Sequence, residues 1–312
     1  MSKNDNLSTP NDTYTLTDEG RPKIRSYLIK KFLFFKVFSN KKKTFYVAGH
    51  IPLVPRLYLP ALFSVMSSVY VLVIFHLVFN NVRSVSPNSK AILILFDILS
   101  FLFFVSYFRT SFTSPGIVPP DWNWDPHSDL RLMVDFPLRT REHRYGHDRN
   151  RPDRARYSKT FHQLILKPDH VCHLVSNMVG FRNYKFFFLS VLYSMCLNTI
   201  STMFIIPEII FLESTALMIF SALSIIISCV SFCFLAKPFC LHIILISKNL
   251  TTIDNYIRIE KLKNCIDYEN NYDLGIWKNF IIIFGKNPLF WLFPTRISCK
   301  KNGYEWEKNI VN

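Results

Sequence analysis

Acidic residues are scarce in this chain of 312 residues: 22 Asp and Glu stand against 37 Lys and Arg, a formal net charge of +15 at pH 7. Such a balance is typical of nucleic-acid-binding proteins, of membrane-surface proteins, and of integral membrane proteins with basic loops. The long apolar runs described below favour the third class, in which basic loops explain the positive charge without nucleic acid. We therefore expect no nucleic-acid partner.

Features of secreted proteins are also missing. The seven cysteines are odd in number, and their spacing is not that of a secreted disulfide framework. The first residues are rich in Ser, Thr, Asn and Asp and lack the apolar stretch of a signal peptide. This composition predicts a disordered, cytosolic N-terminal segment over residues 1–28.

Four apolar stretches approach or exceed the roughly 20 residues that a helix needs to cross a bilayer. They cover residues 57–79, 91–108, 186–206 and 215–246. The last is too long for one upright span, and Pro238 is expected to kink it. The sequence therefore predicts an α-helical integral membrane protein with four transmembrane helices.

The distribution of Lys and Arg predicts the orientation. Eleven precede the first span, 13 lie in residues 109–185 and ten follow the fourth span, whereas residues 80–90 hold two and residues 207–214 none. Since basic loops stay in the cytosol, both termini and the central loop are predicted to be cytosolic. Residues 29–56 read as a basic amphipathic segment that contacts the anionic leaflet before the first span.

Two ionisable residues, Asp97 and Lys237, lie at membrane depth. Such groups either line an internal cavity or reach the interface with a flexible side chain. The sequence leaves both alternatives open.

The central loop contains a single cysteine, Cys172, which follows Asp169 and His170. A thiolate is a strong nucleophile, an imidazole can take the thiol proton, and a carboxylate can orient the imidazole. Basic residues nearby, Arg154 and Lys167 among them, would favour the thiolate and receive phosphate groups. A lone cysteine beside a histidine is nevertheless more often a bystander, so the pattern needs support from the rest of the chain.

That support comes from a resemblance over roughly residues 25–310 to the DHHC-type protein S-acyltransferases, in particular to the Golgi subgroup that includes Ras palmitoyltransferases. Six segments carry it in the family order: TSFTSPGIVP (110–119), RPDRA (151–155), KPDHVC (167–172), VGFRNYKFF (179–187), TTID (251–254) and GKNPLFWLFP (285–294). The signature tetrapeptide reads Asp-His-Val-Cys here, and Asp254 replaces the glutamate of the TTxE motif.

The resemblance implies a DHHC domain over residues 109–185 and a cytosolic tail over 247–312. It implies that Cys172 takes a long-chain acyl group from palmitoyl-CoA and passes it to cysteines of substrate proteins. His170 would be the base, Asp169 its orienter and Thr252 the support of Asp169. The implied partners are lipid, acyl-CoA, substrate proteins with cytosolic cysteines and an accessory subunit, in Golgi or ER membranes.

The family's zinc ligands are absent. The residues at those positions are Gly146, Asp148 or Arg149, Tyr157, Ser158, Phe161, Leu164, Val171 and Met178. Because zinc sites need Cys, His or carboxylate donors, we expect the family zinc ions to be absent and no metal to be bound. A replacement site from His143, His147, His162 and His173 is a weaker alternative. The apolar character of four replacements suggests a small hydrophobic core in the metal's place.

Two other functions remain open. A catalytically inactive scaffold or regulatory partner would keep the four spans, and the lost zinc ligands favour it. A small transporter is a second rival, but no internal repeat is present. Since Asp169, His170 and Cys172 are all present, we favour acyl transfer.

Overall fold

The structure is a computed structural model, and it describes residues 35–39, 42–47, 51–52, 55–81, 87–118, 152–158, 160–161, 163–296 and 303–309. The predicted disordered N-terminus, the positions Gly146 and Asp148–Arg149, and His143, His147 and His162 lie outside these residues.

Four long helices dominate the fold. They are α2 (Pro55–Asn81), α3 (Pro87–Phe112), α5 (Tyr184–Glu208) and α6 (Thr215–Ser247). Each is long and apolar enough to cross a membrane. The predicted fold class, a helical membrane protein with four spanning helices, is confirmed.

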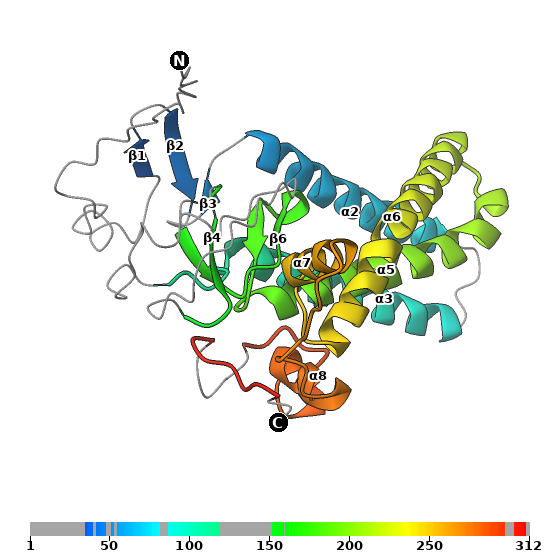
Figure 1. The fold of residues 1–312 in the computed structure, drawn as a ribbon. Helices are drawn as coiled ribbons and strands as arrows, with labels where there is room; N and C mark the ends of the chain where they lie inside the picture. Colours follow the sequence, from blue (N-terminus) through cyan, green and yellow to red (C-terminus); the bar gives the residue numbers. More distant parts are fainter. Residues whose placement is uncertain are drawn as a thin grey trace, which may run out of the picture.

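The four helices lie side by side in one bundle (Figure 1), in which α5 packs against both α3 and α6. Its core is rich in aromatic side chains, such as the stacked pair Phe75 and Phe96. Many large apolar side chains on the outside of the helices are exposed, for example Phe63, Phe101 and Ile226. An apolar exterior of this kind is what a lipid environment requires.

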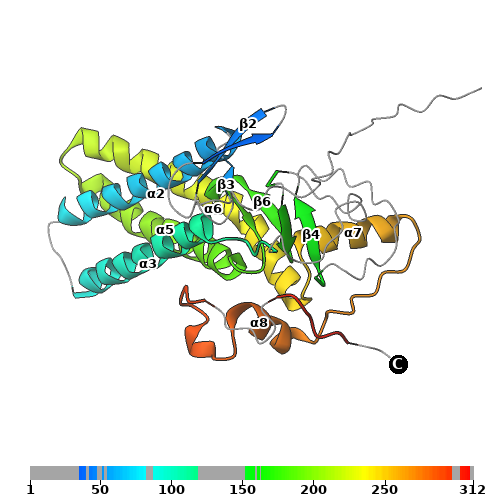
Figure 2. The same cartoon turned by 90° about the vertical axis from the view of Figure 1, so that its left-hand side faces the viewer.

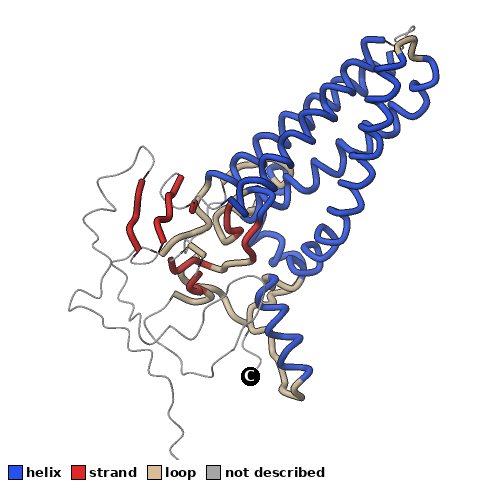
Figure 3. The backbone as a smooth tube through the Cα atoms, turned by 90° about the horizontal axis from the view of Figure 1, so that it is seen from above, coloured by secondary structure: helices blue, strands red, loops and turns tan. Residues whose placement is uncertain are grey.

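Apart from η2 (Ile209–Phe211), which joins the end of α5 to the start of α6, the smaller elements gather at one end of the bundle, where α2 and α5 begin and α3 and α6 end (Figures 2 and 3). We call it the loop end. Here lie two hairpins, β4 (Ala155–Ser158) with β5 (Gln163–Leu166) and β6 (His170–Cys172) with β7 (Asn177–Val179), and the turn η1 (His173–Val175). After α6 follow α7 (Thr252–Lys263), α8 (Ile276–Phe284) and η3 (Pro288–Phe290).

Before α2 the chain forms a three-stranded antiparallel sheet of β1 (Phe35–Ser39), β2 (Lys42–Val47) and β3 (Ile51–Pro52). The sequence did not lead us to expect strands here, because basic residues break the alternation of Phe and Val. Contact of this segment with a membrane surface stays a prediction.

Helix α6 runs through Pro238 as one helix of 33 residues. At 1.5 Å per residue it measures about 50 Å, well beyond the ~30 Å hydrocarbon core. The excess lets its last turns reach the loop end. The two residues selected from the sequence are not buried: Lys237 is exposed, and Asp97 pairs with His76 at 3.1 Å with its side chain 52% exposed.

Candidate active site

The short strand β6 explains the spacing of the predicted site residues. Successive side chains of a strand point to opposite faces, so His170 and Cys172 share one face while Val171 points to the other. Strand β7 pairs with β6, placing Val171 opposite Met178 and Cys172 opposite Asn177. The hairpin thus has a chemical face and a supporting face.

Asp169 lies just before β6 and is completely buried. Its Oδ2 accepts a hydrogen bond from the Thr252 hydroxyl at 2.8 Å and is 2.6 Å from His170 Nδ1. Its Oδ1 accepts the Thr252 backbone N–H at 2.9 Å. A buried carboxylate needs such partners to remain ionised. The contact between Thr252 and Asp169 is the one expected from the TTxE resemblance.

The pKa values of the pair are pushed apart. Burial alone would raise the pKa of Asp169, but the charge of His242, the hydrogen bond and charge of His170, and the Thr252 N–H lower it to about 2. Burial alone would lower the pKa of His170, but hydrogen bonds with Asp169 and Cys172 and the charges of both raise it to about 10. The arrangement therefore keeps Asp169 ionised and makes His170 a stronger proton acceptor than a free imidazole.

His170 connects Asp169 to Cys172. With Nδ1 bonded to Asp169, Nε2 is the ring nitrogen left to interact with Cys172, which lies on the same face of β6. Cys172 is buried, with 7% of the residue exposed, and the His170 side chain is 19% exposed. Asp169, His170 and Cys172 therefore meet in the order that activation of a thiol requires.

The turn after Cys172 attaches this site to the bundle. The Tyr107 hydroxyl of α3 donates to the Leu174 carbonyl in η1 at 2.6 Å, and lies 3.1 Å from the Ala61 carbonyl of α2. Cys172 is consequently held against the ends of two spanning helices.

Thr252 is positioned by the N-terminus of α7. Thr251 and Asp254 form a capping box, in which the Thr251 hydroxyl accepts the Asp254 N–H and the Asp254 carboxylate accepts the Thr251 N–H. The Thr252 N–H is then one of the free donors of the first helical turn, where a negative charge such as Asp169 is stabilised. Asp254 thus has a structural role that the sequence left unclear.

Asp254 is itself held by two arginines, Arg154 at 2.7 Å and Arg156 at 3.3 Å. Burial alone would raise its pKa, but the charges of these arginines lower the pKa well below its usual range. The ion pairs connect the hairpin β4–β5 to α7.

Asn249 is a second connection that sequence reasoning missed. Its side-chain oxygen accepts hydrogen bonds from Arg154 at 3.0 Å and from Lys167 at 2.7 Å, while its amide donates to the Tyr272 carbonyl. Arg154 and Lys167 are 9% and 6% exposed and also face the Trp306 ring. The expectation that these two cations receive phosphate groups is therefore wrong, because both are used inside the protein.

Asn177 and Asn183 seat the hairpin on α3 and were also missed. Both are fully buried. Asn177 donates to the carbonyls of Thr110, Ser111 and Thr113, and Asn183 donates to those of Thr110 and Met178. These bonds satisfy carbonyls at the C-terminal end of a helix. A single Asn in a loop gives no periodic signal, so the sequence offered no reason to select either.

The supporting face of the hairpin packs into an apolar cluster of Phe161, Ile165, Val171 and Met178. Leu164 belongs to the adjacent cluster with Val118, Ala155 and Leu166. Four positions that hold zinc ligands in the family thus carry buried apolar side chains that have no metal-binding atom of use to zinc. These residues do not fit a zinc ion.

Among the described residues, one group brings three potential metal ligands together, namely Asp169, His170 and His242. Two ligands of a tetrahedral zinc lie about 3.3 Å apart, given bonds of about 2.0–2.1 Å. The 2.6 Å between Asp169 and His170 is shorter and fits a shared hydrogen instead. The group is explained as a hydrogen-bonded site.

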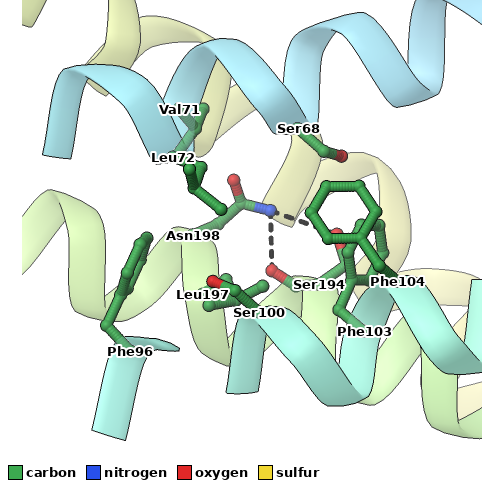
Figure 4. A pocket seen from close by; sticks show the side chains of 10 residues that line it. All are labelled: Ser68, Val71, Leu72, Phe96, Ser100, Phe103, Phe104, Ser194, Leu197 and Asn198. Atoms are coloured by element: carbon green, nitrogen blue, oxygen red, sulfur yellow. Dashed lines mark hydrogen bonds between the residues drawn. The ribbon is translucent and has the colours of Figure 1, made fainter. Parts of the chain in front are cut away.

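A small pocket of about 20 Å³ lies inside the bundle between α2, α3 and α5 (Figure 4). Apolar side chains line it together with the polar groups of Ser68, Ser100, Ser194 and Asn198. Asn198 donates to the Ser194 carbonyl at 2.8 Å, as the dashed lines show. Its volume is that of about one water molecule.

A family model and individual relatives of this chain point to the same protein family. A family model described as DHHC palmitoyltransferase matches residues 139–259. "Probable protein S-acyltransferase 14" of Arabidopsis thaliana is 31% identical over 238 residues, which cover 67% of this chain and 73% of that protein. "Palmitoyltransferase ZDHHC2" of Danio rerio is 30% identical over 261 residues, with coverages of 72% and 69%. The chain therefore belongs to the DHHC palmitoyltransferase family.

Proposed function

We propose that this membrane protein is a protein S-palmitoyltransferase in which Cys172 carries the acyl group, with His170 as base and Asp169 as its orienter. The observation that carries the proposal is the connected series Asp169, His170 and Cys172. Asp169 Oδ2 and His170 Nδ1 are 2.6 Å apart, and His170 and Cys172 lie on the same face of β6. Thr252 is a positioning residue that acts through Asp169.

The reaction has two steps. His170 takes the thiol proton of Cys172, and the sulfur attacks the thioester carbonyl of palmitoyl-CoA. The carbon–sulfur bond to CoA breaks, and the CoA thiolate takes the proton from His170. In the second step a substrate cysteine gives its proton to His170 and attacks the acyl carbonyl. The bond from the acyl carbon to the Cys172 sulfur breaks, and this sulfur takes the proton back from His170. Asp169 keeps its negative charge throughout and stabilises the imidazolium.

The proposal places the loop end in the cytosol, because the basic segments of the chain belong to that side. The acyl donor and substrate cysteines then meet Cys172 at the membrane surface, with the acyl chain among the spanning helices. Burial of a 16-carbon acyl chain among the helices favours this placement, since each buried CH₂ stabilises binding by about 0.8 kcal/mol. Golgi or ER location and an accessory subunit rest on the resemblance alone.

The proposal also holds that the domain works without the family zinc ions. The apolar cluster of Phe161, Ile165, Val171 and Met178 supports this, since each such side chain contributes about 1.5–3 kcal/mol when buried. Two apolar clusters then hold the hairpins where the metal ions would otherwise do so.

The test is acyl transfer to the purified protein in detergent from a clickable palmitoyl-CoA, with Cys172→Ser as control and zinc measured on the same sample. A hydroxylamine-labile label on the wild type, absent from Cys172→Ser, with no stoichiometric zinc, is the expected result. Equal labelling of both proteins, or of neither when both are folded, would refute the enzyme proposal and favour an inactive scaffold. Stoichiometric zinc would refute the metal-free domain.

A further inference from the structure

A histidine of the fourth spanning helix lies against the proposed catalytic base and has no role in the reaction above. His242 is near the end of α6 and is 4% exposed. Its ring centroid is 5.6 Å from that of His170, and a ring nitrogen lies within 4.8 Å of ligand atoms of Asp169 and His170. A buried polar ring at this place calls for an explanation, because an apolar residue would avoid the loss of hydration.

His242 is held in turn by Tyr184, the first residue of α5. The Tyr184 hydroxyl lies 2.8 Å from His242 Nδ1, and both side chains are buried. This bond fixes the ring plane of His242 and leaves its other nitrogen for the Asp169–His170 side. Two spanning helices are thus joined beside the base.

Phe187 completes the surroundings of the base. Its ring contacts His170 edge to face at 5.0 Å and contacts His242 in the same manner, also at 5.0 Å. The His170 imidazole therefore packs against two rings whose positions are set by α5 and α6. Since the hydrogen bond with Asp169 fixes only one ring nitrogen, these contacts restrict rotation about that bond and keep Nε2 aimed at Cys172.

We propose that Tyr184 and His242 form a hydrogen-bonded pair that positions His170 for proton transfer with Cys172. The inference rests on the acyl-transfer function proposed above and deepens it. His242 acts through the polar edge of its ring, and Tyr184 acts by orienting that ring. Neither residue touches the acyl group or CoA.

The experiment compares His242→Phe, which keeps a ring and removes its nitrogens, with Tyr184→Phe, which removes one hydroxyl. His76→Gln is the matched control, because His76 belongs to the same bundle and pairs with Asp97 instead. For each purified protein we would measure acylation of Cys172 over a range of palmitoyl-CoA concentrations and the thermal midpoint. We would also measure alkylation of the Cys172 peptide by iodoacetamide between pH 5.5 and 9.

The expected result is a fall of the maximal acylation rate by about tenfold or more in His242→Phe and by several-fold in Tyr184→Phe, as a misplaced catalytic group produces. The KM for palmitoyl-CoA stays within about twofold. Alkylation near neutral pH slows in the same order, and His76→Gln behaves as the wild type.

Wild-type rates and alkylation profiles in both variants would show that the ring merely fills space and would overturn the proposal. A change confined to KM would also overturn it, because it would place His242 in the acyl-CoA site. If His242→Phe fails to fold, Tyr184→Phe decides alone. The alkylation profile does not depend on acyl transfer, so failure of this inference is distinguishable from an inactive wild type.

Discussion

Restoring the family signature at position 171 is expected to harm this protein. Val171→His would make the tetrapeptide Asp-His-His-Cys, yet the new imidazole would point into the cluster of Phe161, Ile165 and Met178. A single added histidine supplies one zinc ligand where four are needed. The ring would therefore be buried without a metal or a hydrogen-bond partner.

The structure gives the size of the effect. Val171 is 9% exposed and lies opposite Met178 in the hairpin. A buried polar group without a partner costs about 1–3 kcal/mol, and forcing a larger side chain into a packed core costs about 1–3 kcal/mol more. Together the free energy of unfolding should fall by about 2–6 kcal/mol, a large share of the ~5–15 kcal/mol of a typical domain.

The assay is thermal unfolding followed by tryptophan fluorescence in detergent, with added zinc or with a strong chelator. Val171→Leu is the control, because it is also larger than Val but apolar, and it should lose only the packing part. Acylation of Cys172 should weaken in Val171→His, since the same short strand carries both residues. Higher stability on adding zinc, with about one zinc ion bound per chain, would refute this reasoning.

Three further outcomes are expected. Thr252→Val removes the hydroxyl group that donates to Asp169 but keeps the backbone donor. The pKa of Asp169 should therefore rise from about 2 towards its usual value. Acylation of Cys172 should slow about tenfold, which corresponds to a loss of about 1.4 kcal/mol of transition-state stabilisation. The stabilisation from Asp169 should be complete above pH ~4 and vanish as the pH falls to about 2, whereas that from His170 should be complete below pH ~6.5 and vanish as the pH rises to about 10. The free energy of unfolding, measured with denaturant across this pH range, should therefore have a maximum between the two windows. A flat profile would contradict this prediction. Gly303→Ala places a Cβ against the Phe181 ring, closer than van der Waals contact allows, at a φ of +84°. Limited proteolysis should therefore cut the C-terminal segment faster than in the wild type, and an equal rate would show that this segment is not docked.

The spans and the grouping of Asp169, His170 and Cys172 could be predicted from the sequence for physical reasons. A helix in lipid needs a continuous apolar run, and a strand places residues i and i+2 on one face, so both patterns are local. The contacts of Asn249 and His242 are of another kind. Asn249 meets Arg154 95 residues away, and His242 meets Tyr184 58 residues away. One polar residue in a long apolar helix carries no sign of its partner until the bundle has formed.

The two faces of the hairpin β6–β7 explain how the zinc ligands can be absent while the chemical group is complete. Alternation along β6 directs His170 and Cys172 to one side and Val171 to the other, and the partner of Val171 across the ladder is Met178. The supporting face needs only a filled, rigid contact, which apolar packing provides. The chemical face depends instead on Thr252, held by the capped end of α7. Because the two requirements fall on opposite faces, the support can be apolar without moving any atom of the proposed proton transfer.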